Sequence, residues 1–153
     1  WLRDFYQSGA LISTMLRVIH PTLYDAGQLS LTRLMPEGEE VWDVLKVWPS
    51  VYSTMSVISN HLTPPHWDTQ PQASWYDLHA TVGPHPDAIM EFPRLGLRLS
   101  YLLGTVVAFS GILLCHCVPA NDGNNICYVY YMQDKVHERE DVEVTSWMTL
   151  NLY

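Results

Sequence analysis

Cysteines and long apolar runs are scarce in this sequence, and each scarcity excludes a class of protein. Only 3 cysteines occur in 153 residues, and no pair has the C-x-x-C spacing of a zinc site. An odd, small number of cysteines favours reduced thiols and an intracellular protein. No stretch reaches the roughly 18 consecutive apolar residues of a membrane-spanning helix. We therefore expect neither a disulfide-stapled secreted domain nor a membrane protein.

Basic residues are the second scarcity. The chain has 8 Lys and Arg against 16 Asp and Glu, a net charge of −8 at pH 7. An acidic chain repels phosphate groups, which argues against broad electrostatic binding of nucleic acid. Charged residues make up 16% of the chain and hydrophobic residues 48%, which is typical of a globular protein. The length predicts a single domain over residues 1–153, and the start at Trp1 without Met indicates a fragment of a longer protein.

The spacing of apolar residues changes near residue 50. Before this point apolar residues recur at helical spacing, which predicts one helix closed by Pro21, a second over residues 22–35 and a third after residue 38. After it, apolar and polar residues alternate, which predicts short strands. These strands cover residues 51–59, 76–82, 88–92, 95–101, 105–109, 112–117 and 126–132.

Helices followed by many short strands predict an α+β fold. We expect the strands to form a double-stranded β-helix, which is a jelly-roll-like barrel, with the N-terminal helices packed outside. The helical part would cover residues 1–50, the barrel core residues 51–135 and a C-terminal tail residues 136–153.

A short histidine and carboxylate motif is the strongest functional signal. His66 and Asp68 are two positions apart, so an extended strand presents both side chains on one face. Together with His116 they match the two-histidine, one-carboxylate set that holds non-heme Fe(II). Two ordinary interpretations stay open: a solvated surface loop after Pro64 and Pro65, and a core histidine at position 116.

Longer stretches are similar to one known family. The chain resembles the fungal, transposon-associated branch of the TET/JBP-type oxygenases, which depend on 2-oxoglutarate and Fe(II). The resemblance implies that Fe(II), 2-oxoglutarate and O2 serve to oxidise the methyl group of 5-methylcytosine or thymine. It also implies that His66, Asp68 and His116 hold the iron, that DNA is the partner and that the protein is nuclear. The similar stretches are residues 16–21, 56–60, 63–68, 75–77, 104–111 and 130–139.

Three positions depart from the pattern of this family. An arginine before the distal histidine and a glycine after it are common in relatives, whereas this chain has Cys115 and Cys117. The third departure concerns the co-substrate site of the family. Its members carry an arginine at the start of the last strand, which binds the distal carboxylate of 2-oxoglutarate, whereas this chain has Asn125. An amide cannot replace the charged, bidentate guanidinium group. Asn125, Cys127 and Arg98 are therefore the candidates for contacting the co-substrate, with a plain surface role as the alternative for Arg98.

The departure leaves two further interpretations of the function open. The first is a degenerate, non-catalytic barrel that keeps the metal ligands but binds 2-oxoglutarate poorly. The second is an oxygenase that acts on a protein or a small molecule, which the acidic charge favours over DNA.

Four polar or aromatic residues near the motif are candidates for contacting the substrate, because the family holds its substrate in this region: Asn60, Trp75, Asp77 and His79. Trp75, with Tyr76, could stack on a flipped base. The alternative for Trp75 is an ordinary core position, and for Asp77 and His79 it is the solvent face of a strand.

Overall fold

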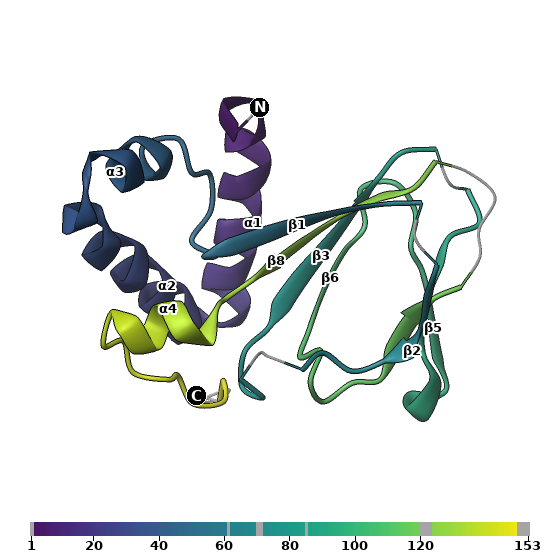
Figure 1. Ribbon diagram of the computed structural model, residues 1–153. Helices are drawn as coiled ribbons and strands as arrows, with labels where there is room; N and C mark the ends of the chain where they lie inside the picture. Colours follow the sequence, from purple (N-terminus) through teal and green to yellow (C-terminus); the bar gives the residue numbers. More distant parts are fainter. Residues whose placement is uncertain (1, 61, 70–71, 85, 120–123, 150–153) are drawn as a thin grey trace. The chain divides into compact units, whose positions relative to one another are not determined.

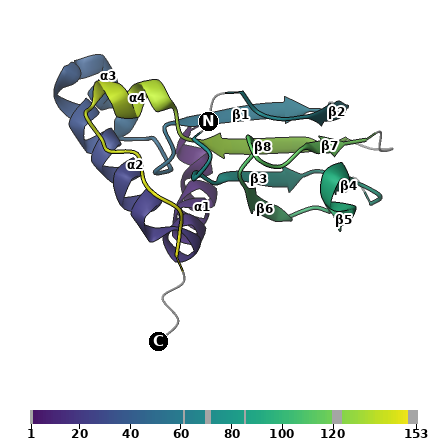
Figure 2. The same ribbon diagram turned by 90° about the horizontal axis from the view of Figure 1, so that it is seen from below.

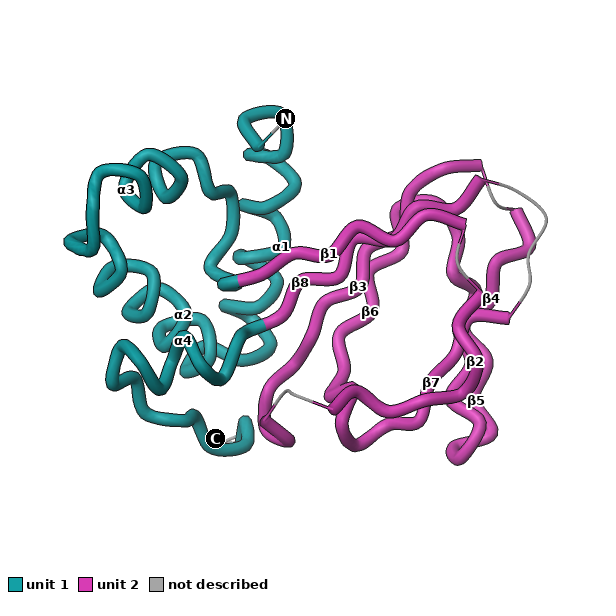
Figure 3. Tube along the Cα trace, viewed as in Figure 1, with its two compact units in different colours: residues 1–53, 132–153 teal, residues 54–131 magenta. Residues whose placement is uncertain are grey.

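The computed structural model describes residues 2–149 except 61, 70–71, 85 and 120–123. The chain forms two compact units (Figure 3). Residues 1–53 and 132–153 form one, called the helical unit below, and residues 54–131 form the other, called the sheet unit. The prediction of a single domain is not tested by this division and stays a prediction.

The helical unit contains two long helices and two short ones. They are α1 (Tyr6–Ile19), α2 (Pro21–Leu34), α3 (Glu39–Leu45) and α4 (Asp134–Arg139), with 3-10 turns at Leu2–Phe5 and Met35–Glu37. His20 separates α1 from α2, because its ring accepts a hydrogen bond from the Leu23 backbone N–H at 3.3 Å and thereby caps α2. The three predicted N-terminal helices are confirmed, whereas α4 falls across the boundary predicted between barrel and tail.

The sheet unit contains two four-stranded antiparallel sheets. The first has the order β1 (Thr54–Ser59), β8 (Ile126–Tyr131), β3 (Asp77–Val82) and β6 (Val106–Phe109). The second has the order β2 (Thr63–His66), β7 (His116–Val118), β4 (Ile89–Phe92) and β5 (Leu97–Ser100).

Strands from the two ends of the unit are neighbours in both sheets. Figure 2 shows β8 between β1 and β3, although β8 comes last in the sequence. In Figure 1 the sheets containing β1 and β2 lie opposite one another. This alternation of early and late strands is the order of a double-stranded β-helix, and it confirms the predicted α+β class with N-terminal helices.

Aromatic residues fill the space between the two sheets. Phe92 of β4 and Phe109 of β6 pack edge to face with ring centroids 5.1 Å apart. They belong to a buried cluster with Ala88, Met90 and Tyr101. Among the described residues, no helix has the length and apolar character that crossing a bilayer requires.

The largest correction to the predicted strands concerns residues 112–117. Residues 111–113 form a turn, and β7 begins only at His116. The prediction of a strand over residues 112–117 is therefore wrong for the positions before His116, and Leu113 is half exposed. The segment was predicted as a strand because it is apolar. The turn that it forms instead places Gly111 and Leu114 at the candidate site described next.

Candidate metal centre

Three predicted ligand residues converge in the sheet unit. The His66 Nε2 atom lies 3.7 Å from Asp68 Oδ1, and the His116 Nε2 atom lies 3.9 Å from Asp68 Oδ2. The ligand atoms of the three side chains all lie within 4.8 Å of one another, the one such group among the described residues. The motif and the distant histidine therefore meet at one point.

Strand pairing explains the convergence. His66, at the end of β2, lies directly opposite His116, at the start of β7. Directly opposed residues on antiparallel strands point to the same face, and the two imidazole centroids are 4.2 Å apart. Asp68 follows just past the end of β2, where its backbone N–H donates to the Gly111 carbonyl at 3.1 Å.

The hydrogen bonds of both imidazoles leave the same nitrogen for a ligand. His66 Nδ1 is 2.9 Å from the Pro64 carbonyl, and His116 Nδ1 is 2.9 Å from the Leu114 carbonyl. A carbonyl only accepts, so each Nδ1 carries the hydrogen and each Nε2 keeps its lone pair. This orientation by a backbone carbonyl is common in metal-binding histidines.

The three side chains fit a divalent transition metal. Two neutral imidazoles and one carboxylate are the donors of the facial set that holds Fe(II). With one ligand atom from each residue, the three donors lie within 4.8 Å of one another, so together they could hold one such ion. Burial lowers the pKa of His116, which favours the neutral imidazole that a metal needs.

Gly111 is a residue of the candidate centre that the sequence analysis did not single out. A β-carbon at this position would lie 1.8 Å from Asp68 Oδ2 and 2.8 Å from its carboxyl carbon. The Gly111 backbone also hydrogen-bonds the Asp77 carboxyl group. Only glycine leaves space for the Asp68 carboxylate in its present position, and no feature of the sequence reports that contact.

Asp77 and His79 point into the sheet unit, not to solvent. Both are buried on β3, and the His79 ring packs on Phe109 at 4.7 Å and on His116 at 5.9 Å between centroids. Asp77 Oδ1 and His79 Nε2 are buried without a hydrogen-bond partner. The alternative of a solvent-facing strand is therefore wrong for both.

Burial keeps both of these groups uncharged near pH 7. It raises the pKa of Asp77 to about 8, with a further contribution from the charge of Asp68. It lowers the pKa of His79 to about 3, with smaller contributions from His116 and His66.

Two other predicted substrate residues have structural roles. Trp75 is only 1% exposed, so the core alternative holds and its ring cannot stack on a base. Asn60 adopts a left-handed backbone conformation (φ 49°), and its side-chain oxygen accepts a hydrogen bond from the Asn125 backbone N–H at 2.8 Å. Trp67, between His66 and Asp68 in the sequence, is 40% exposed, and the Arg94 guanidinium group lies over its ring at 4.7 Å.

The predicted co-substrate residues Asn125 and Cys127 share an inner sheet face with uncharged neighbours. Asn125 Oδ1 accepts a hydrogen bond from the Thr81 hydroxyl at 3.1 Å, and Cys127 Sγ lies 3.0 Å from the Tyr101 hydroxyl. Thr81 and Cys127 are opposite one another on β3 and β8. We call Thr81, Tyr101, Asn125 and Cys127 the neutral row.

The neutral row stays uncharged. The Phe109 ring packs near part of this row and near the candidate metal ligand His116. Burial raises the pKa of the Cys127 thiol and of the Tyr101 hydroxyl, so neither ionises at physiological pH. Tyr101 and Cys127 pack in the same cluster as Phe109, whose centroid is 4.8 Å from that of His116.

Arg98, the third co-substrate candidate, does not reach this row. Its guanidinium group pairs with Glu91 at 2.9 Å, and its side chain is 67% exposed. The other Lys or Arg between positions 54 and 131 is Arg94, which is exposed and lies over the Trp67 ring at 4.7 Å. The surface alternative therefore holds for Arg98.

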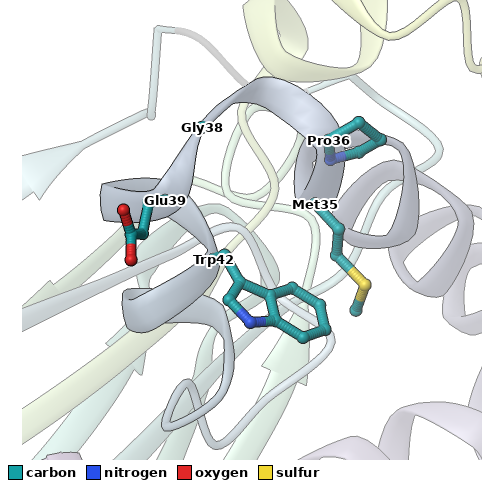
Figure 4. Close-up of a pocket in the computed structure, with 5 residues that line it drawn as sticks. All are labelled: Met35, Pro36, Gly38, Glu39 and Trp42. Carbon is teal, nitrogen blue, oxygen red and sulfur yellow. The ribbon is translucent and has the colours of Figure 1, made fainter.

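A hollow in the helical unit contains none of the predicted site residues. It is lined by Met35, Pro36, Gly38, Glu39 and Trp42. The Met35 and Trp42 side chains point toward one another, whereas Glu39 points away (Figure 4). One carboxylate that turns out of an apolar hollow offers no catalytic arrangement.

Comparison with known proteins agrees with this geometry. Residues 3–134 match the Tet_JBP family model, described as the oxygenase domain of the 2OGFeDO superfamily. The fold is similar to a solved structure of NgTET1 in complex with 5mC DNA, with a TM-score of 0.63 and 17% sequence identity. The match covers 87% of this chain and 50% of that chain, so this chain spans half the length of that protein. No curated protein sequence matches significantly.

Proposed function

We propose that this chain, which belongs to the Tet_JBP family of oxygenase domains in the 2OGFeDO superfamily, oxidises the methyl group of 5-methylcytosine or thymine in DNA. The observation that carries the proposal is the convergence of His66, Asp68 and His116 ligand atoms within 4.8 Å. A fungal, transposon-associated origin and a nuclear location are part of the same proposal.

The protein's own groups prepare this chemistry. The Pro64 and Leu114 carbonyls orient the two imidazoles, and Gly111 leaves space for the Asp68 carboxylate. Bound by these three side chains, Fe(II) would supply the activation of dioxygen for oxidation of a C–H bond. Asp68 and His66 are each about one-third exposed, which leaves the centre open to a substrate from solvent.

Three residues support a base as the substrate. Asp77 and His79 each have a buried polar atom without a partner beside the metal ligands, as a site awaiting a polar ligand would have. Trp67, which lies between His66 and Asp68 in the sequence, is 40% exposed, and an exposed aromatic ring can stack on a flipped base. NgTET1, the similar solved structure, is in complex with 5mC DNA.

The proposal is tested by Asp68→Ala with Asp87→Ala as the matched control. Asp87 is an exposed aspartate of the same unit. Loss of the carboxylate leaves two neutral ligands, so we expect Fe(II) affinity and oxidised bases to fall at least about 100-fold in Asp68→Ala. Asp87→Ala should match the unaltered chain in both measurements.

Calorimetry measures the metal, and mass spectrometry of digested DNA measures the product. The assay contains Fe(II), ascorbate and a 2-oxo acid. The acid is either 2-oxoglutarate or 2-oxopentanoate, which has the same carbon chain without the second carboxylate. Equal Fe(II) affinity in the two variants would contradict the metal site.

A non-catalytic barrel is the second candidate function. It is favoured because both arginines of the sheet unit are exposed and already engaged, one with Glu91 and one with Trp67. The residues present therefore fit the metal but not the second carboxylate of 2-oxoglutarate. Tight Fe(II) binding without oxidised DNA bases would favour this candidate, or an oxygenase that acts on a protein or small molecule.

A further inference from the structure

The sheet unit contains very little positive charge, and what it contains is not at the centre. Arg94 and Arg98 are the only Lys or Arg between positions 54 and 131. Both are exposed, and each is held by a partner on the surface. Permanent positive charge is therefore absent from the inner faces that the structure describes in this unit.

The groups that do line the inner face are neutral or acidic. The neutral row contributes hydroxyl, amide and thiol groups, and the hydroxyl of Thr81 already donates to Asn125. Asp68 and Asp77 are the acidic side chains at the centre, close enough that the charge of Asp68 acts on Asp77. A carboxylate placed here beyond the reach of the metal meets the charge of Asp68 and no permanent positive charge.

This charge distribution discriminates between 2-oxo acids. The metal can neutralise the carboxylate of the 2-oxo acid group that chelates it, and this applies to every such acid. 2-Oxoglutarate brings a second carboxylate at the far end of its chain. Moving that carboxylate out of water without a cation is strongly unfavourable, whereas an uncharged chain of similar length buries apolar surface.

We infer that the centre binds a 2-oxo acid with an uncharged side chain in preference to 2-oxoglutarate. The inference rests on the proposed function in one respect, namely that His66, Asp68 and His116 hold the metal. The contacts that favour an uncharged chain are the apolar cluster around Phe109 and the neutral row beside it.

The experiment titrates the full chain, loaded with Fe(II) under anaerobic conditions, with two ligands. One is 2-oxoglutarate, and the other is 2-oxopentanoate, which has the same carbon chain without the second carboxylate. The metal-to-ligand charge-transfer absorption reports chelation without any turnover. We expect 2-oxopentanoate to bind at least about tenfold more tightly, the loss expected for an unpaired buried charge.

Asn125→Arg places a cation in the neutral row. It should reverse the preference, so that 2-oxoglutarate binds more tightly than 2-oxopentanoate by about tenfold or more. Arg98→Ala, which removes a surface cation, is the control and should leave the preference unchanged. Asn125 is buried, so the variant can fail to fold; the preference of the unaltered chain decides the inference without it.

The outcomes separate this inference from the proposed function. Fe(II) binding is measured first, by calorimetry, and a chain that binds no metal contradicts the proposed function and the inference together. If the metal binds but 2-oxoglutarate chelates it as tightly as 2-oxopentanoate, or more tightly, the inference is wrong and the metal site stands. If the metal binds and neither acid gives the absorption, the inference is also wrong.

Discussion

The three candidate metal ligands and the neutral row lie in the same unit. They differ in whether the side chains present provide all the groups that binding requires. At the metal ligands, every group has a defined role: two oriented imidazoles, one carboxylate and a glycine that leaves space for it. In the neutral row, the hydroxyl, amide and thiol groups mainly pair with one another.

The candidate metal centre has all three donors of its set, whereas the described residues of the neutral row include no Lys or Arg. Metal binding depends on three side chains and on backbone carbonyls, which follow from strand pairing. Under the proposed function, binding of a dianion needs a cation, and Asn125 does not supply one. The neutral row is therefore where this chain lacks the arginine that the resemblance in the sequence leads one to expect.

The largest effect that sharpens the comparison is expected from Gly111→Ala. The new β-carbon would meet Asp68 Oδ2 at 1.8 Å, so the carboxylate must turn away from the two histidines. We expect Fe(II) affinity measured by calorimetry to fall by about 100-fold, while the chain stays folded. Leu113→Ala, at a half-exposed position in the same turn, should not change the affinity. An unaltered affinity in Gly111→Ala would show that the carboxylate is not held where the structure places it.

A smaller effect is expected from Asp77→Asn in the metal-free protein. The folded pKa of Asp77 is raised from 3.8 to about 8, so between these values the folded chain keeps a proton that the unfolded chain releases. Stability conferred by that proton is complete below about pH 4 and is lost as the pH rises toward 8. Asparagine does not titrate, so the variant should gain on the unaltered chain as the pH rises.

Urea unfolding of both proteins from pH 4 to pH 8 measures this difference. Each pH unit contributes at most about 1.4 kcal/mol, so we expect a gain of several kcal/mol at most at pH 8 and almost none at pH 4. A difference that does not vary with pH would mean that Asp77 is ionised in the folded chain.

The smallest effect, and the one that could break the comparison, is expected from Arg98→Ala. Its ion pair with Glu91 is exposed, so the free energy of unfolding should change by less than about 1 kcal/mol. The affinities for 2-oxoglutarate and 2-oxopentanoate should not change, because the guanidinium group is on the surface. A loss of 2-oxoglutarate binding would show that Arg98 supplies the positive charge for the second carboxylate, and the contrast between the two regions would then be wrong.

The elements were predictable where the pattern was long or strict. The helices of the first 50 residues have a wide apolar stripe, and β3 alternates over six residues, so both were located to within a few positions. The segment 112–117 was not, because a short apolar run is compatible with a buried strand and with an apolar turn. The orientation of β3 was also ambiguous, since its polar face with Asp77 and His79 points inward.

The sequence by itself determined the ligand types and their local geometry. A histidine and an aspartate two positions apart at a strand end share one face wherever that strand lies, and Asn125 carries no charge in any fold. Only the tertiary structure decided that β2 pairs with β7, which sets His66 opposite His116, and that Gly111 touches Asp68. It alone showed that Arg98 is exposed and paired with Glu91. The physical reason is that side-chain type and strand alternation are local properties, whereas contact, burial and electrostatic pairing depend on which distant segments become neighbours.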